Sequence, residues 1–213
     1  MRYKAILFDM DGTLLDTLTD MADAVNHILS VHGWPLRTIE EVRAFVGNGA
    51  RRLMERAVPP EVTGGDFEAV LTEYRDWYQA HNCVATAPYP GIPVLLAALA
   101  EAGIKTAVVS NKPDATTKTL AARFFPGLPA FGQRDDVPPK PAPDLVFRAL
   151  ETLGVDAADA IYVGDSEVDV ATARNAGLPL AAVSWGFRGR RALAEAGAAV
   201  IVDTAAELLE VLR

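Results

Sequence analysis

Residues 3–17 read YKAILFDMDGTLLDT, and this stretch decides the fold. Its first six residues form an apolar run that is typical of a buried parallel strand. Asp9 ends the run and Gly12 follows it closely, which predicts that the strand stops and the backbone turns there. Along an extended strand end, residues 9 and 11 point to one side while Met10 points to the other. The sequence therefore places two carboxylates, Asp9 and Asp11, side by side at the end of a strand.

The rest of the chain alternates short apolar runs with amphipathic helical stretches. This is the pattern of a doubly wound, Rossmann-like α/β fold, in which helices cover both faces of a parallel sheet. The predicted strands are residues 3–8, 104–109, 160–164, 180–184 and 199–202, and the predicted helices after residue 90 are 92–102, 114–124 and 141–153. Ligands of such folds bind outside the carboxyl ends of the strands. Because Asp9, Ser110 and Asp165 each follow a predicted strand, we expect them to converge on one site.

The segment between the first two predicted strands is far longer than one crossover connection needs. Apolar residues recur at helical spacing over 18–29 and 67–78, and two shorter apolar faces flank the helix breaker Gly47-Asn48-Gly49. Thr17 and Asp20 are spaced like a capping box at the start of the first helix. We therefore predict two domains. They are an α/β core, residues 1–15 and 87–213, and an inserted α-helical cap, residues 16–86.

Composition excludes several classes of function. A formal charge of −8 and the absence of a basic run argue against nucleic-acid binding, which depends on clustered Lys and Arg. No apolar stretch is long enough for a membrane span, and Asp9 interrupts the N-terminal apolar run before it could act as a signal peptide. The single cysteine, Cys83, cannot form an internal disulfide. We expect a cytoplasmic protein, a monomer or weak homodimer, with no nucleic-acid or membrane partner.

The paired carboxylates indicate a bound cation. Two unit charges about 4 Å apart repel by roughly 4 kcal/mol at an effective dielectric constant of 20. The candidate ligands are all carboxylates: Asp9, Asp11, Asp165 and Asp169. Hard oxygen ligands of this kind favour Mg²⁺ over zinc.

The same carboxylates could perform phosphoryl transfer. An ionised aspartate can attack phosphorus to form an aspartyl-phosphate, and a second carboxylate can serve as general acid and base. Such a reaction also needs donors around the phosphoryl oxygens. Ser110 and Asn111 at a strand end, and Lys140 between two prolines, could supply them.

Four motifs, in order, resemble those of the haloacid dehalogenase-like phosphatase superfamily over almost the whole chain. They are DMDGTLLDT, SNK, Lys140-Pro141 and GDSEVDVATARNAG. The insert matches the position of that family's helical cap, and FVGNGARRLMERAV with VSWGFR resembles the phosphoglycolate phosphatase subgroup. The resemblance implies a Mg²⁺-dependent phosphatase that hydrolyses a small phosphorylated metabolite, similar to phosphoglycolate, through an aspartyl-phosphate.

The resemblance also implies roles for individual residues. Asp9 would be the nucleophile and Asp11 the general acid/base. Mg²⁺ would be held by the carboxylates of Asp9 and Asp165 and by the backbone carbonyl of Asp11. Ser110, Asn111 and Lys140 would hold the phosphoryl group. Asp169 would support the metal or orient Lys140, and Glu167 is a competing carboxylate for the metal.

Several alternatives remain or are excluded on single residues. The dehalogenases of this superfamily lack the second aspartate, and its phosphonatases use a cap lysine, whereas this chain has no lysine between Lys4 and Lys105. A sugar-phosphate mutase similar to β-phosphoglucomutase, or a pyrophosphatase, would use the same residues and stays open. A catalytically silent module that binds a phosphorylated metabolite is disfavoured, because it has no use for the pair Asp9 and Asp11.

Substrate choice is expected to come from the cap. Asn48 and Arg51, in and just after the glycine-containing helix break, are our candidates for contact with the leaving group. An arginine suits a small carboxylate such as glycolate, but it suits a pyrophosphate or a sugar acid phosphate equally well.

Overall fold

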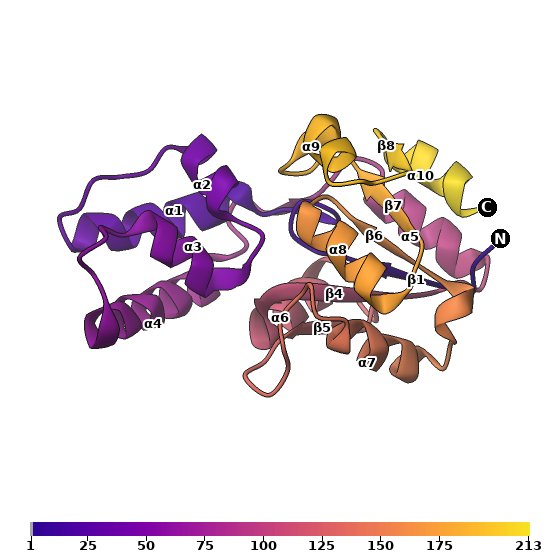
Figure 1. Cartoon of the computed structure of the whole chain (residues 1–213), viewed down its shortest axis with the longest axis horizontal. Coiled ribbons are helices and arrows are strands. Elements are labelled where there is room, and N and C mark those ends of the chain that lie inside the picture. The colour runs from indigo at the N-terminus through magenta and orange to yellow at the C-terminus, as the bar shows by residue number, and fades with distance from the viewer. Residues whose placement is uncertain (1) are drawn as a thin grey trace.

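The computed structural model describes residues 2–213 and consists of an α/β core with four helices packed beside it (Figure 1). All strand pairs of the core sheet are parallel, in the order β5-β4-β1-β6-β7-β8. The strands are β1 Ala5–Phe8, β4 Lys105–Pro113, β5 Ala130–Gln133, β6 Ala160–Gly164, β7 Leu180–Val183 and β8 Ile201–Val202. Because β1 lies between β4 and β6, the residues that follow these three strands meet at one edge.

Helices cover both faces of this sheet, as predicted for a doubly wound fold. They are α5 Ile92–Glu101, α6 Asp114–Phe124, α7 Asp144–Leu153, α8 Glu167–Ala176, α9 Gly189–Glu195 and α10 Ala205–Leu212, with a short 3-10 turn at Ala157–Asp159. Successive residues of β1 point to opposite faces. Ile6 and Phe8 therefore pack with residues of α5 and α10, whereas Ala5 and Leu7 pack with residues of α7 and α8.

The insert forms the predicted helical cap with a hydrophobic core of its own. Its helices are α1 Leu18–Val31, α2 Ile39–Phe45, α3 Gly49–Ala57 and α4 Gly64–His81. Apolar residues from all four helices pack together, joined by Phe187 from the α/β core. The chain enters and leaves the cap through an antiparallel pair of short strands, β2 Leu15–Asp16 and β3 Ala87–Pro88. The predicted borders at residues 16 and 86 thus fall at this two-stranded connection.

Some predicted boundaries were wrong, for local reasons. Helix α7 begins at Asp144 rather than at Pro141, because Ala142 precedes Pro143 and a residue before proline avoids helical angles. Strand β4 continues to Pro113 instead of ending at residue 109, so Ser110 and Asn111 lie within the strand. The sequence analysis did not predict the short strands β2 and β3, the edge strand β5, or helices α9 and α10. Among residues 2–213, no helix is both long and apolar enough to cross a bilayer.

The predicted capping box at Thr17 and Asp20 is also wrong. Thr17 does precede α1, but its side chain makes no capping bond and its hydroxyl donates to Asp11 Oδ1 at 2.7 Å. The buried carboxylate of Asp20 accepts from the backbone N–H groups of Val84, Ala85 and Thr86, at 3.1, 2.8 and 2.9 Å. Asp20 therefore ties α1 to the returning segment, because three donors there outcompete the helix end.

Candidate active site

The predicted site residues meet at the end of β1. Asp9 and Asp11 lie beside Ser110 of β4 and Asp165, which follows β6, and all four line one cavity of about 330 Å³ between core and cap. Met10 turns the other way and is fully buried in the core. The alternation along the strand end thus leaves both carboxylates facing the cavity, as the sequence indicated.

Asp9 is paired with Lys140. The Nζ atom of Lys140 lies 2.9 Å from Asp9 Oδ1 and 2.8 Å from Asp169 Oδ1, and it donates to the Tyr162 hydroxyl at 3.0 Å. The lysine is 3% exposed. Burial by itself lowers the pKa of Lys140, but Asp169 and Asp9 outweigh it and raise this pKa well above its ordinary value. Lys140 is therefore a fixed positive charge next to Asp9.

Asn111 holds the backbone of Lys140 in place. Its Oδ1 accepts the Lys140 N–H at 2.7 Å and its Nδ2 donates to the Lys140 carbonyl at 3.0 Å. The side-chain amide that we expected to hold the phosphoryl group is thus already engaged on both sides. The structure places Asn111 beside the cavity and gives its side chain a positioning task.

Asp11 has a lysine of its own, which the sequence analysis did not include in the site. Lys112 Nζ lies 3.0 Å from Asp11 Oδ2, and the Tyr78 hydroxyl of the cap lies 2.9 Å from the same nitrogen. Thr17 holds the other oxygen of Asp11. Residues 110 and 112 point to the same side of an extended strand. That spacing was the available signal for Lys112.

Asp165 completes a buried cluster of carboxylates with Asp9 and Asp169. One oxygen atom from each of the three lies within 4.8 Å of the other two. Asp165 accepts from the Thr13 hydroxyl at 3.2 Å and from the Phe187 N–H at 2.7 Å. Burial and the neighbouring carboxylates Asp169 and Asp9 nevertheless raise the pKa of Asp165 well above its ordinary value.

The charge balance of the cluster fits a divalent cation. Burial raises the pKa of Asp9 to about 7; Asp169 and Asp11 add to this effect and Lys140 opposes it. Four carboxylates, at positions 9, 11, 165 and 169, face two lysines, Lys112 and Lys140, which leaves two negative charges in excess. An all-oxygen donor set with such an excess suits Mg²⁺.

Asp169, not Glu167, adjoins this cluster. The Oδ2 atom of Asp169 accepts from the hydroxyl of Ser166 at 2.6 Å and from its N–H at 3.1 Å, which caps α8. Its Oδ1 contacts Lys140. Glu167 is exposed and pairs with Arg188 at 3.0 Å. Of the two predicted roles of Asp169, orientation of Lys140 is the one with a direct contact.

Gly12 lets the turn after β1 approach Asp165 closely. Its φ is +83°, and a Cβ atom on it would lie 2.4 Å from Asp165 Oδ2. Any larger residue would both strain the turn and displace that carboxylate. The glycine that the sequence analysis placed near the phosphate is therefore needed first for packing against Asp165.

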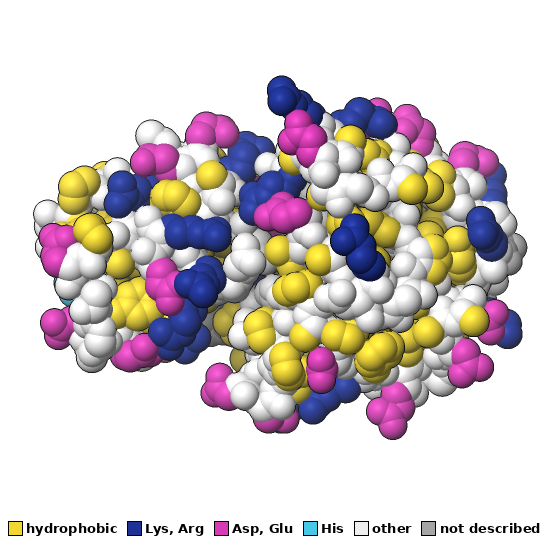
Figure 2. All heavy atoms as spheres, in the orientation of Figure 1, with side chains coloured by type: hydrophobic (Ala, Val, Ile, Leu, Met, Phe, Trp, Pro, Cys, Tyr) yellow, Lys and Arg dark blue, Asp and Glu magenta, His cyan; other side chains and the backbone are white. Residues whose placement is uncertain are grey.

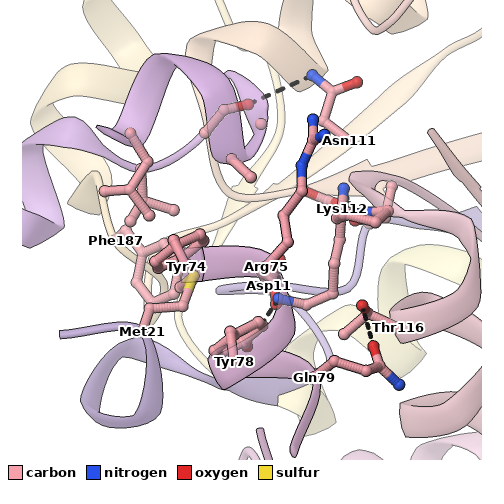
Figure 3. A pocket seen from close by; sticks show the side chains of 18 of the residues that line it. Asp11, Met21, Tyr74, Arg75, Tyr78, Gln79, Asn111, Lys112, Thr116 and Phe187 are labelled. Atoms are coloured by element: carbon pink, nitrogen blue, oxygen red, sulfur yellow. Dashed lines mark hydrogen bonds and ion pairs between the residues drawn. The ribbon is translucent and has the colours of Figure 1, made fainter. Parts of the chain in front are cut away.

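The cap supplies a mostly apolar wall to the cavity. Its lining includes Met21, Val46, Leu53, Tyr74 and Tyr78. Figure 3 shows that Tyr74, Tyr78, Arg75 and Gln79 reach the cavity from α4. Gln79 accepts from the Thr116 hydroxyl of the core at 2.6 Å, so α4 is bonded directly across the cavity mouth.

Asn48 and Arg51 do not line this cavity, although Gly47, Gly49 and Ala50 do. Arg51 forms a two-pronged pair with Glu68, each bond at 2.8 Å, on the cap surface. The prediction that these two residues contact the leaving group gains no support from the arrangement, because the guanidinium of Arg51 already has a carboxylate partner.

Comparison with known proteins agrees with this geometry. Residues 6–183 match the family model of the haloacid dehalogenase-like hydrolases. N-acetylmuramic acid 6-phosphate phosphatase of Pseudomonas aeruginosa is 36% identical over 100% of this chain and 96% of its own length. Phosphoglycolate phosphatase of Pseudomonas savastanoi is 34% identical over 97% of this chain and 78% of its own length.

A solved structure shares the same architecture. The protein from Lactobacillus delbrueckii, provisionally named a phosphoglycolate phosphatase, superposes with a TM-score of 0.94 and 37% identity, covering 100% of this chain and 99% of its own. The family match spans β1 to β7, and it therefore includes Asp9, Lys140 and Asp165 as well as the inserted cap. The chain belongs to the haloacid dehalogenase-like hydrolase family.

Proposed function

We propose that this protein is a Mg²⁺-dependent phosphatase that hydrolyses a small phosphate monoester, similar to phosphoglycolate, through an aspartyl-phosphate. One observation carries the proposal. Two adjacent carboxylates, Asp9 and Asp11, face the same cavity and each is held by a different buried lysine. Such an arrangement supports two different roles for the two carboxylates. The phosphatase names of the relatives agree with it.

In the first step Asp9 attacks phosphorus. Its Oδ1 accepts from Lys140 and from the N–H of Met10, at 2.9 and 2.7 Å, and this leaves Oδ2 as the attacking oxygen. The bond from phosphorus to the leaving oxygen breaks as the new bond to Oδ2 forms. Asp11 donates its proton to the leaving oxygen, so the leaving group departs as a neutral hydroxyl.

In the second step Asp11 takes a proton from water, and the water oxygen attacks the phosphorus of the aspartyl-phosphate. The bond to Asp9 Oδ2 breaks and inorganic phosphate leaves. Lys112 and Thr17 hold the two oxygens of Asp11 throughout, which keeps the carboxyl oriented for both proton transfers.

Asp9, Asp165 and Asp169 are the carboxylates that would surround Mg²⁺, with Asp165 the one that is free of a lysine. When bound there, the metal ion supplies positive charge that keeps Asp9 ionised and balances the phosphoryl oxygens. Lys140 provides a fixed charge on the opposite carboxylate oxygen. Ser110 lines the same cavity and offers a hydroxyl to the phosphoryl group.

The proposal is tested by the turnover of p-nitrophenyl phosphate and phosphoglycolate. We expect phosphate release that EDTA abolishes and Mg²⁺ restores. Reaction with a ³²P-labelled ester, stopped by acid, should leave label on the wild-type protein and none on Asp9→Asn. Binding of the ester without phosphate release would indicate a silent binding module.

A mutase and a pyrophosphatase are separated by the same assays. A mutase would isomerise hexose 1-phosphates with little release of phosphate, and a pyrophosphatase would prefer inorganic pyrophosphate to every ester. The apolar wall of the cap argues for an organic leaving group, because pyrophosphate offers no apolar surface to Met21, Leu53 or Tyr74.

A further inference from the structure

Arg75 differs from the other arginines of the cap. Five cap arginines have a carboxylate or a backbone carbonyl as partner: Arg37 with Ala57, Arg43 with Glu40, Arg51 with Glu68, Arg52 with Glu55 and Arg56 with Phe45. Within the described residues 2–213, Arg75 has neither a hydrogen bond nor an ion pair. It is also the only one of the six that lines the cavity above Asp9 and Asp11.

The position of Arg75 suits contact with a ligand. It lies on α4 between Tyr74 and Tyr78, and Figure 3 shows its side chain extending along the cavity toward Asn111. Asp76 lines the same rim without an ion pair to Arg75. The guanidinium is therefore charged, exposed to the cavity and uncommitted, and its planar donors match the geometry of a carboxylate.

The phosphoryl group does not need Arg75. Lys140 and Lys112 already supply two buried positive charges at the end of β1, and the carboxylate cluster fits a divalent cation beside them. An additional cation on the cap wall therefore serves a second anionic group in the part of the substrate that extends toward the cap. Figure 2 shows further Lys and Arg side chains on the cap and at its border with the core, where they attract anions.

The named substrates of the relatives share the expected group. Phosphoglycolate and N-acetylmuramic acid 6-phosphate differ greatly in size, but both carry a carboxylate in the part that leaves. A cavity of about 330 Å³ with an apolar and aromatic wall has room for more than a two-carbon acid.

We propose that Arg75 is a specificity-determining residue that binds a carboxylate of the leaving group, so that the protein selects phosphate monoesters of hydroxy acids. This inference rests on the proposed phosphatase function. It moves the selective arginine from Arg51 on the cap surface to Arg75 on the cavity wall.

The test compares esters that differ by the carboxylate. N-acetylmuramic acid 6-phosphate and N-acetylglucosamine 6-phosphate form one matched pair, and phosphoglycolate with ethyl phosphate forms another. In the Mg²⁺-loaded wild type we expect the acid of at least one pair to have the higher kcat/KM. Arg75→Gln should reduce that preference about 10- to 100-fold, mainly through KM, since one hydrogen-bonded charge pair is lost. The pair with the larger preference identifies which size of acid fits.

Arg52→Gln is the control, because Arg52 is an exposed cap arginine paired with Glu55 and outside the cavity. It should leave the preference unchanged. An equal preference in wild type and Arg75→Gln, or equal rates for acid and neutral esters in the wild type, would overturn the proposal.

Binding distinguishes failure of this inference from failure of the phosphatase proposal. The probes are 3-phosphonopropanoate and propylphosphonate, which resist hydrolysis and differ by the carboxylate. Calorimetry with Mg²⁺ present should show tighter binding of the acid to wild type and loss of that difference in Arg75→Gln. If no ester is hydrolysed, the phosphatase proposal fails while this measurement still decides the role of Arg75.

Discussion

The two walls of the cavity are built on opposite principles. On the core side, Asp9 and Lys140 are buried, and each is held by several hydrogen bonds or ion pairs to residues of other strands and loops. On the cap side, the wall is apolar and aromatic, and its cation, Arg75, has no partner among residues 2–213. The core side is organised before any substrate arrives, whereas the cap side keeps a charge available for one.

This difference assigns different tasks to the two regions. Preorganised charges reduce the cost of reorganisation during a reaction, so the chemistry belongs to the core. An uncommitted guanidinium contributes nothing until a ligand supplies the anion, so selectivity belongs to the cap. The regions are linked at few points, among them Lys112 with Tyr78 and Asp20 with residues 84–86.

The largest expected effect tests whether the chemistry lies in the core. Asp9→Asn removes the attacking carboxylate, and we expect kcat for p-nitrophenyl phosphate to fall about 10⁴-fold or more, as for other catalytic nucleophiles. Asp23→Asn, on an exposed position of α1, is the matched control and should keep full activity. Substantial residual turnover in the Asp9 variant would place the nucleophile elsewhere.

The second effect concerns the connection between the regions. Asp20→Ala leaves three backbone N–H groups of residues 84–86 without their acceptor, and we expect a loss of about 3 kcal/mol in the free energy of unfolding. Urea denaturation measures it. Asp23→Ala again serves as control. A change below about 0.5 kcal/mol would mean that water replaces the carboxylate at these donors.

The third effect tests the contact between the two walls at Asp11. Lys112→Met removes the ammonium 3.0 Å from Asp11 Oδ2, and we expect kcat to fall about 100-fold, the lower range for loss of general acid and base catalysis. Tyr78→Phe removes only the cap's hydroxyl and should cost less. The reverse ranking, with Tyr78→Phe the more damaging variant, would make the cap a direct participant in the chemistry.

The smallest expected effect concerns the charge excess in the core. Folding raises the pKa of Asp9 from 3.8 to about 7, so the folded protein holds a proton that the unfolded chain has released at pH 5 to 6. In EDTA, stability therefore falls as pH rises between about 4 and 7, and we expect Tm to be about 2–4 °C lower at pH 8 than at pH 5.5. Added Mg²⁺ should reduce this difference. A Tm in EDTA that rises with pH would contradict the charge balance.

The sequence predicted most of the fold and the residues at the end of β1. Apolar runs, helical periodicity and the polar residues that follow the strands depend on neighbours a few positions apart, and the sequence displays these directly. Short strands such as β2 and β3 were missed because two paired residues leave no periodic pattern. The start of α7 was misjudged although Pro143 was a visible signal.

Amino-acid order by itself therefore determined the α/β core, the inserted helical cap, and the identity of Asp9, Asp11, Lys140 and Asp165 as the residues to examine. Only the tertiary structure decided which side chains are already engaged. Asn111 holds the Lys140 backbone, Arg51 is paired with Glu68, and Arg75 is left free. The physical reason is competition. A side chain's task depends on which donors and acceptors, distant in sequence, reach it first in the folded chain.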